Sequence, residues 1–303
     1  MENVLYAKNE KVFFIIGVYF FVILSAYSQT ELLFGLGGGK FRFDKIKKNT
    51  FDTAQVCAYY KVAFLNDSTK RNDYTKGLCL LSFSDRYVRF GDYYAVLADS
   101  INDLCAKNKK NAHDEELDDA HTLAISKKVF YITTMTDLEN LQTTVQLRRM
   151  REYQYTMPTP DMHWILESGD TLISGVSCKK ATCNYAGRHY IAWYDEKASL
   201  SHTGPYIFYG LPGLIMKIYD DKRNWIFENV GIEKAEKMKD MYLYKNKKII
   251  KTSREHALAA YKNETENMLL AAIESGRIKF IKKGSRFNDM MKRRPSNMIE
   301  QEW

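Results

Sequence analysis

The chain has 303 residues, of which 45% are apolar and 14% aromatic, and it carries a formal net charge of +8 at pH 7. Disordered chains have few aromatic residues and low hydrophobicity, so this composition excludes disorder for the bulk of the protein. The aromatic richness and the low count of 5 prolines favour strands over helices. The positive charge favours anionic partners, although net charge bears more on solubility than on function.

An apolar run near the N-terminus is typical of an export signal. Residues 12–24 read VFFIIGVYFFVIL, and Ala26-Tyr27-Ser28 follows with the small-x-small pattern of a cleavage site. The run has the length of a signal-peptide core and is short for a membrane span. We therefore expect a signal peptide over residues 1–28 and a mature chain that begins at Gln29. An uncleaved N-terminal anchor helix is the alternative.

A glycine-rich stretch lies in residues 29–50, which we expect to be a flexible leader. The sequence Gly37-Gly38-Gly39-Lys40 is similar to part of a phosphate-binding loop. That loop would also need glycine in place of Phe34 and serine or threonine in place of Phe41. The spacing therefore excludes a nucleotide site here.

The next segments alternate between strand and helix patterns. Apolar residues at every second position predict a strand over residues 55–64. Residues 77–90 predict two strands with a break at Ser84-Asp85. Apolar residues at helical spacing predict a helix over residues 93–108. The polar residues 107–128 indicate a surface loop or a helical insertion, and residues 138–149 show no clear pattern.

The strand signal is strongest after Pro158 and Pro160. The segment lengths and the turns between them, the first at Ser168-Gly169-Asp170, favour consecutive antiparallel strands, a meander. A helix follows over residues 252–274, with Ser253 as its N-cap. The predicted strands are residues 163–167, 172–178, 188–194, 206–209, 214–219 and 225–232.

These patterns predict an α+β fold that is rich in β-structure, with a largely antiparallel curved sheet and a few packed helices. Residues 51–280 would form a single domain, and residues 281–303 a basic C-terminal tail. Helices on one face of the sheet would leave the concave face as an apolar groove. This arrangement is similar in kind to periplasmic lipid or lipoprotein carriers, by analogy of fold alone.

The sequence contains none of the short motifs of common catalytic or metal sites, such as HExxH, CxxC or GxSxG. We therefore expect no cofactor. The basic tail belongs to no nucleic-acid-binding module, so we expect no nucleic-acid partner. An enzyme site would have to be assembled by folding from His163, His189, His202 and Cys178. Basic neighbours would lower the pKa of a Cys178 thiol, but Lys179 points to the opposite face of a strand.

The chain has 5 cysteines, and export permits disulfides. Because the number is odd, at least one cysteine has no partner within the chain. Cys178 and Cys183 would point to opposite faces of one strand, which argues against a bridge between them. We expect zero to two disulfides.

One motif stands out, in residues 204–218, which read GPYIFYGLPGLIMKI. The hexapeptide and its lead-in resemble the GLPGLI family of exported bacterial proteins. Farther along, Asn297-Met298-Ile299-Glu300 is similar to a family ending that reads Asn-Pro-Ile-Glu. The motif residues are Gly204, Pro205, Gly210, Leu211, Pro212, Gly213, Leu214 and Ile215, and further matching residues are Cys178, Lys179, Lys180, Gly187, Arg188 and Trp193.

The resemblance implies export, and hence a location in the periplasm, at the outer membrane or outside the cell of a bacterium with two membranes. It implies no activity, because the family has no established biochemical function. By itself, Pro212-Gly213 suits the centre of a type II turn that leads into a buried strand. The alternative is a backbone surface for a ligand or partner.

The leading hypothesis from the sequence is a non-enzymatic envelope protein that binds a hydrophobic ligand or an outer-membrane or other envelope partner. Export, β-richness and the absence of catalytic motifs favour it. The first alternative is a hydrolase with a histidine and cysteine site from separate strands. The second is a purely structural envelope component. The sequence leaves the oligomeric state open.

Overall fold

The structure, a computed structural model, describes residues 45–107, 115–198, 200, 202–236, 240–274 and 291–303. These residues belong to one compact unit of Arg42–Trp303. The expected signal peptide and most of the expected leader lie outside the described residues. Residues 48–50 of that leader form the start of a strand. Within the described ranges, no helix has the length and apolar character needed to cross a membrane.

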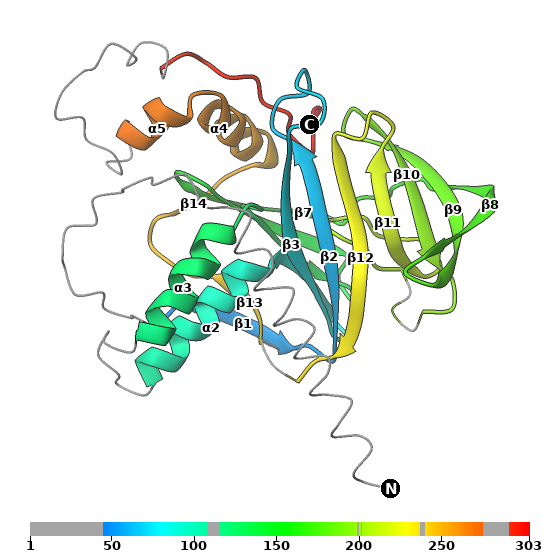
Figure 1. The fold of residues 1–303 in the computed structure, drawn as a ribbon, viewed down its shortest axis with the longest axis horizontal. Helices are drawn as coiled ribbons and strands as arrows, with labels where there is room; N and C mark the ends of the chain where they lie inside the picture. The colour runs from blue at the N-terminus through cyan, green and yellow to red at the C-terminus, as the bar shows by residue number, and fades with distance from the viewer. Residues whose placement is uncertain (1–44, 108–114, 199, 201, 237–239, 275–290) are drawn as a thin grey trace, which may run out of the picture. The chain divides into compact units, whose positions relative to one another are not determined.

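An open 12-stranded sheet dominates the fold (Figure 1). Two meanders, β2 to β7 and β8 to β12, are joined where β2 pairs with β12. Neighbouring strands are antiparallel except β14 and β7. The strands are β2 (Val56–Leu65), β3 (Tyr74–Phe83), β4 (Tyr87–Asp92), β5 (Ile132–Asp137), β6 (Gln142–Arg148), β7 (Glu152–Pro158), β8 (Ile165–Ile173), β9 (Val176–Tyr185), β10 (Arg188–Asp195), β11 (Leu214–Asp220), β12 (Trp225–Lys234) and β14 (Ile249–Lys251).

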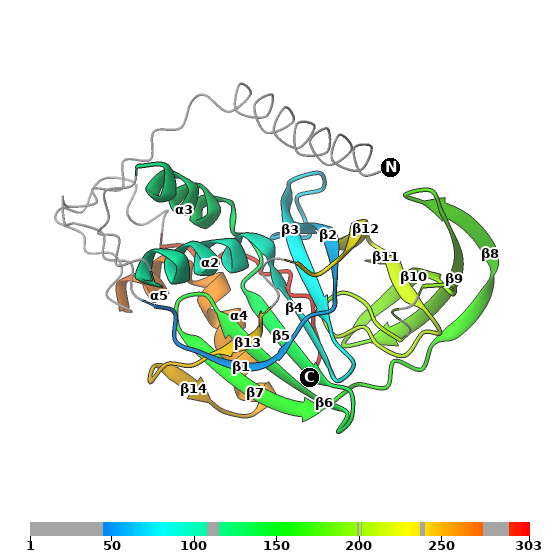
Figure 2. The same ribbon diagram turned by 90° about the horizontal axis from the view of Figure 1, so that it is seen from below.

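A separate two-stranded sheet pairs β1 (Lys48–Thr53) with β13 (Asp240–Tyr244). The described helices are α2 (Tyr93–Lys107), α3 (Glu115–Lys127), α4 (Arg254–Glu266) and α5 (Met268–Glu274). They lie beside the β3–β7 half of the sheet, apart from β8–β11 (Figure 2). The prediction of a β-rich, largely antiparallel fold with few helices is therefore confirmed.

Helices and strands cover both faces of the large sheet, where the sequence predicted helices on one face. Leu80 and Leu81 are neighbours on β3, and both are fully buried. Successive side chains of a strand point to opposite faces. Leu81 belongs to the main core with Leu258 of α4, whereas Leu80 packs in a second cluster with Val96 of α2 and Leu243 of β13.

The expected apolar groove is filled by two chain segments. Residues 206–209, predicted as a strand, are instead part of a buried loop in which the Phe208 amide donates to the Pro205 carbonyl. Ile207 and Phe208 join the main core together with Met298 and Ile299 from the C-terminal segment. The φ of Tyr206 is 59°, outside the extended region of a strand.

Local signals placed several boundaries correctly. Ser253 caps α4, and its side chain accepts a hydrogen bond from the His256 amide. The predicted helix is interrupted at Asn267, whose φ and ψ of −115° and 41° are not helical.

The turn expected at Ser168-Gly169-Asp170 is a bulge within β8. The chain reverses instead at Ser174-Gly175, where both residues have the positive φ of a tight hairpin turn.

Candidate functional site

The GLPGLI hexapeptide is mostly interior. Leu211, Leu214 and Ile215 are buried, whereas Gly210 and Pro212 are exposed. The Gly213 amide donates to the Leu211 carbonyl at 2.7 Å, which closes a three-residue turn around Pro212. The four-residue type II turn expected from the sequence would have placed its hydrogen bond one residue later.

Close packing accounts for two of the glycines. A Cβ on Gly213 would lie 2.1 Å from the carbonyl oxygen of Asp195, and one on Gly204 would lie 2.9 Å from that of Phe208. Both distances are shorter than any normal van der Waals contact. The backbone carbonyl groups cannot move aside as easily as a flexible side chain could. The hexapeptide is therefore a tight turn. It packs closely against the end of β10 and leads into β11.

We expect Gly213→Ala to lower the free energy of unfolding by about 1–3 kcal/mol or more, because the added methyl group forces the backbone apart. Urea unfolding followed by tryptophan fluorescence measures this loss. Gly231→Ala is the matched control, since a Cβ there meets nothing within 4 Å. Equal stabilities of the two variants would contradict the packing explanation.

The further family-matching residues have separate roles. Lys179 and Lys180 form ion pairs with Glu196 and Glu167, each at 2.6 Å. Trp193 packs with the buried Cys178 on one face of the sheet. Gly187 takes φ 78° in the β9–β10 turn. Arg188 is the member that reaches the core, where it meets the C-terminal segment.

The histidines and the cysteine proposed for a hydrolase site do not interact with one another. His163 lies 3.3 Å from Asp161, His189 bonds Asn184 at 2.9 Å, and His202 lies 3.4 Å from the Gly210 carbonyl. All three are exposed. Over the described ranges, no group of three or more His, Cys, Asp or Glu side chains is arranged to hold a metal ion.

Cys178 has the properties of a structural thiol. Burial, together with the nearby Asp195 carboxylate, raises the pKa of its thiol to about 11. Cys183 lies in the main core on the other face of the sheet, so the prediction of opposite faces is confirmed. The five cysteines are buried, and none pairs with another in a disulfide within the described chain.

Alkylation of Cys178 should be slow in the folded protein. At pH 8 about one thiol in a thousand is ionised when the pKa is about 11, and the thiolate is the reactive form. Iodoacetamide labelling, quantified by mass spectrometry of the Cys178 peptide, should be at least about 100-fold slower in buffer than in urea. Rapid labelling of Cys178 alone in the folded protein would instead indicate a nucleophile.

The end of the expected basic tail belongs to the core. Residues 297–300 are buried, and the Asn297 side chain donates to the Leu65 carbonyl at 2.7 Å. The indole of Trp225 donates to the Asn297 carbonyl at 3.0 Å. The basic residues stand before Pro295, whereas the segment after it carries the apolar Met298 and Ile299. Burial of these side chains draws the segment inward.

Arg188 holds residues 297–300 in place through hydrogen bonds. Its guanidinium donates to Asp220 at 3.1 Å, to the Asn297 side chain at 2.6 Å and to the Ile299 carbonyl at 3.0 Å. Glu300, in turn, accepts hydrogen bonds from Tyr206 and Arg254. These contacts join two stretches that the sequence singled out separately, Gly187-Arg188 and residues 297–300.

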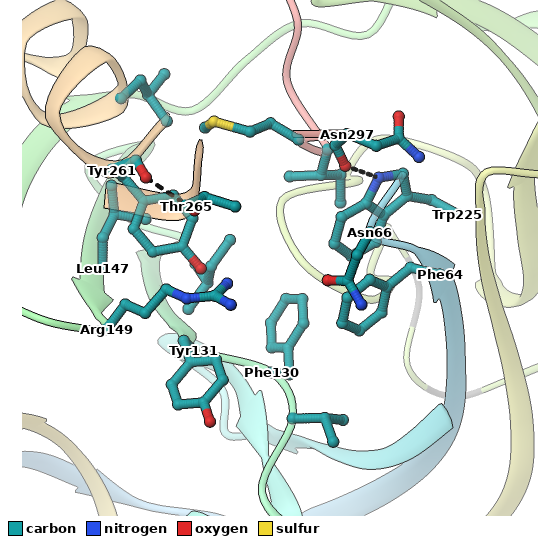
Figure 3. Close-up of a pocket in the computed structure, with 15 residues that line it drawn as sticks. Phe64, Asn66, Phe130, Tyr131, Leu147, Arg149, Trp225, Tyr261, Thr265 and Asn297 are labelled. Atoms are coloured by element: carbon teal, nitrogen blue, oxygen red, sulfur yellow. Dashed lines mark hydrogen bonds between the residues drawn. The ribbon is translucent and has the colours of Figure 1, made fainter. Parts of the chain in front are cut away.

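A pocket lies where this segment, α4 and the ends of β2, β6 and β12 meet (Figure 3). Its inner cavity measures about 40 Å³ and is enclosed mainly by aromatic and aliphatic side chains. Phe64 and Trp225 stack on one wall with ring centroids 4.5 Å apart. The lining residues are Phe64, Asn66, Val129, Phe130, Tyr131, Ile132, Leu147, Arg149, Trp225, Leu258, Tyr261, Thr265, Asn297, Met298 and Ile299.

Arg149, directly after β6, is the charged residue of the cavity. Its guanidinium points toward the middle of the space, and the Asn66 amide points there from the opposite wall (Figure 3). The Arg149 guanidinium donates to the Met268 sulfur at 3.6 Å and lies 5.4 Å from the Tyr131 ring centroid. No carboxylate of the described chain pairs with it. Burial raises the pKa of the neighbouring Tyr261, so this hydroxyl is protonated at neutral pH.

The cavity borders a larger polar hollow of about 560 Å³, and Asn66, Arg149 and Thr265 line both. Lys70 and Arg294 add two cations to this hollow, and Asp67 and Asp73, from the same turn as Lys70, add two carboxylates. Arg294, like Arg149, has no carboxylate partner among the residues described. The other lining residues are Met268 and Pro295.

This arrangement suits an anionic group held beside an aromatic surface. Binding pockets combine apolar walls with a few polar groups that fix orientation. An arginine binds carboxylate or phosphate through two parallel hydrogen bonds. The inner cavity is close in size to a water site, so it has room for neither an acyl chain nor a ring, and a ligand would lie in the adjoining hollow.

Sequence reasoning did not find this pocket. Arg149 closes a stretch, residues 138–149, that had no clear pattern. Its neighbours in space come from distant parts of the chain, Phe64, Trp225 and Asn297. The one available signal was the family-like ending at residues 297–300, which borders the pocket.

Comparisons with known proteins leave the family open. No family model matches the chain, and no curated protein matches it. Among solved structures it is similar to PNGF-II in two crystal forms, with 12% identity over 70% of this chain and TM-scores of 0.42 (P21) and 0.43 (C2). The matched region spans about a third of PNGF-II, 34% and 33% in the two forms. A similarity this low carries no assignment of function.

Proposed function

We propose that this chain is an exported, non-enzymatic envelope protein that binds a small anionic ligand in the pocket around Arg149. The observation that carries the proposal is the guanidinium of Arg149, which points into an aromatic-walled cavity with no carboxylate partner in the described chain. The Arg149 side chain is half-buried and also lines the polar hollow, so its guanidinium can pair with an anion that binds there. A bound carboxylate, phosphate or sulfonate supplies that counter-charge.

The proposal narrows the ligand class expected from the sequence. The wholly hydrophobic ligand is replaced by one with an anionic group and an apolar part. The adjoining hollow supports both parts: Met268 and Pro295 can contact the apolar part, and Lys70 and Arg294 the anionic one. Export across the inner membrane and membership of the GLPGLI family remain parts of this proposal, on the sequence features given above.

The binding role is tested by calorimetric titration with four ring compounds of similar size. Benzoate and phenyl phosphate are the anionic probes, benzyl alcohol is the neutral probe, and benzylamine is the cationic probe. We expect only the anionic probes to bind. Equal binding of benzyl alcohol and benzoate, or no binding by any probe, would count against the proposal.

Arg149→Gln should weaken benzoate or phenyl phosphate binding by at least about tenfold, because a charge-assisted hydrogen-bond pair is lost. The variant keeps the length and polarity of the side chain while removing its charge. Arg71→Gln is the matched control, since Arg71 is exposed and lines neither cavity. Unchanged affinity in Arg149→Gln would place the bound anion elsewhere.

A further inference from the structure

An apolar cavity of about 230 Å³ lies between α5, the residue after Arg149 and the chain segment that begins at Met291. We call it the methionine cavity. Methionine has an unbranched, adaptable side chain and is common on surfaces that accept varied apolar ligands. The apolar side chains of its wall are Met150, Met268, Leu269, Leu270, Ala272 and Met291.

The methionine cavity and the polar hollow share two lining residues, Met268 and Arg294. The Met268 sulfur accepts a hydrogen bond from the Arg149 guanidinium at 3.6 Å, so this side chain connects the cation of the hollow with the apolar wall. Arg294 is held beside the end of α4, because its amide donates to the Glu266 carbonyl at 2.8 Å. A ligand whose anionic group lies between Arg149 and Arg294 therefore has an apolar space within reach.

Glu266 also lines the methionine cavity, but its carboxylate is already neutralised. It forms an ion pair with Lys262 at 2.9 Å. It accepts hydrogen bonds from Arg293 Nε at 2.9 Å and from the Ser296 hydroxyl at 3.0 Å. An anion in the neighbouring hollow therefore meets no unpaired negative charge from this residue.

The size and the wall of the methionine cavity indicate what it can hold. An apolar cavity of about 150 Å³ holds one benzene molecule. By the same proportion, the methionine cavity holds an aliphatic chain of about eight carbons. None of its described lining residues is aromatic, so the wall offers aliphatic contacts in place of ring stacking.

We propose that the ligand of the hollow is a single-chain anionic amphiphile. Its anionic head pairs with Arg149 and Arg294, and its aliphatic chain, about eight carbons long, lies in the methionine cavity. This inference rests on the anionic site of the proposed function and specifies the apolar part of its ligand. Burial of the chain adds affinity in proportion to the apolar area that leaves water.

Calorimetric titration with linear carboxylates tests the chain. Butanoate, hexanoate and octanoate should bind with affinities that rise about threefold for each added methylene group. Decanoate should gain nothing over octanoate, because the cavity is then full. 1-Octanol, which has the chain without the charge, should bind at least about tenfold more weakly than octanoate.

The same series separates the two proposals. Equal affinities for butanoate and octanoate, with benzoate also bound, would leave the anionic site in place and overturn the aliphatic chain alone. Equal affinities for 1-octanol and octanoate would overturn both proposals, because the charge would then contribute nothing. Binding of neither benzoate nor any linear carboxylate would also overturn both.

The double variant Leu270→Gln/Met291→Gln tests where the chain lies. Leu270 is 41% exposed and Met291 is half-buried, so the fold should tolerate glutamine at both positions. We expect octanoate affinity to fall by at least about tenfold and butanoate affinity to stay unchanged, because butanoate is too short to extend past the hollow. Ile125→Gln is the matched control, since Ile125 is 52% exposed on α3 and lines neither cavity. A preference for octanoate that persists in the double variant would place the chain elsewhere and overturn the proposal.

Discussion

Replacing Glu300 by alanine is expected to lower the free energy of unfolding by about 3–5 kcal/mol, the usual cost of breaking a buried ion pair from one side. The carboxylate of Glu300 is fully buried. It accepts a hydrogen bond from the Tyr206 hydroxyl and one from Arg254 Nε at 3.1 Å. Burial raises the pKa of Tyr206 well above its usual value, so that hydroxyl remains a donor at neutral pH.

Without Glu300, two donors lose their acceptor inside the protein. The Arg254 side chain is 22% exposed, so water reaches it only in part. An unsatisfied buried donor costs about 1–3 kcal/mol, and a charged one costs more. The substitution should also weaken the attachment of residues 297–300 to the core.

Chemical denaturation followed by tryptophan fluorescence measures this loss. The control is Glu302→Ala, two residues farther along, because Glu302 is exposed and takes part in neither hydrogen bond. We expect its effect to stay within about 0.5 kcal/mol. Glu300→Gln keeps the shape and should fall between the two. If Glu300→Ala and Glu302→Ala are equally stable, the buried pair does not hold the segment.

The second large effect is expected at Arg188. Arg188→Met should destabilise the fold by about 3–5 kcal/mol, because Asp220 stays buried without its cation. The same change removes the donors to the Asn297 side chain and to the Ile299 carbonyl. Asp220 keeps hydrogen bonds from Asn224 and from the Trp225 amide, which limits the loss.

A double-mutant cycle separates this attachment from general packing. We expect Arg188→Met and Asn297→Ala to show a coupling energy of about 0.5–3 kcal/mol, because the two side chains share a hydrogen bond. Lys222→Met is the control for removal of a nearby surface charge, since Lys222 is exposed. Strict additivity in the cycle would mean that Arg188 stabilises β10 without holding residues 297–300.

Much of the secondary structure followed from short-range patterns. Alternating apolar residues located β2, and the turn chemistry between residues 83 and 87 separated β3 from β4. Helical spacing located α2, and Ser253 marked the start of α4. These signals depend only on neighbours within a few residues, since alternation and capping are local properties.

Errors occurred where local and long-range requirements disagree. Residues 206–209 have the composition of a strand, yet they fill the core as a loop in which Tyr206 reaches Glu300. Ser168-Gly169 has the composition of a turn, yet β8 continues through it as a bulge because β9 runs alongside. In each case tertiary packing overrode the local preference.

By itself, the sequence determined the β-rich class, the positions of β2, β3, β4, β10, β11 and β12, and a turn at Pro212-Gly213 that leads into β11. Only the tertiary structure decided that β2 pairs with β12, that residues 297–300 enter the core and that Arg149 points into a pocket. Asn297 bonds a carbonyl 232 positions away, at Leu65. No periodicity encodes such a contact, because it depends on how the whole sheet brings distant segments together.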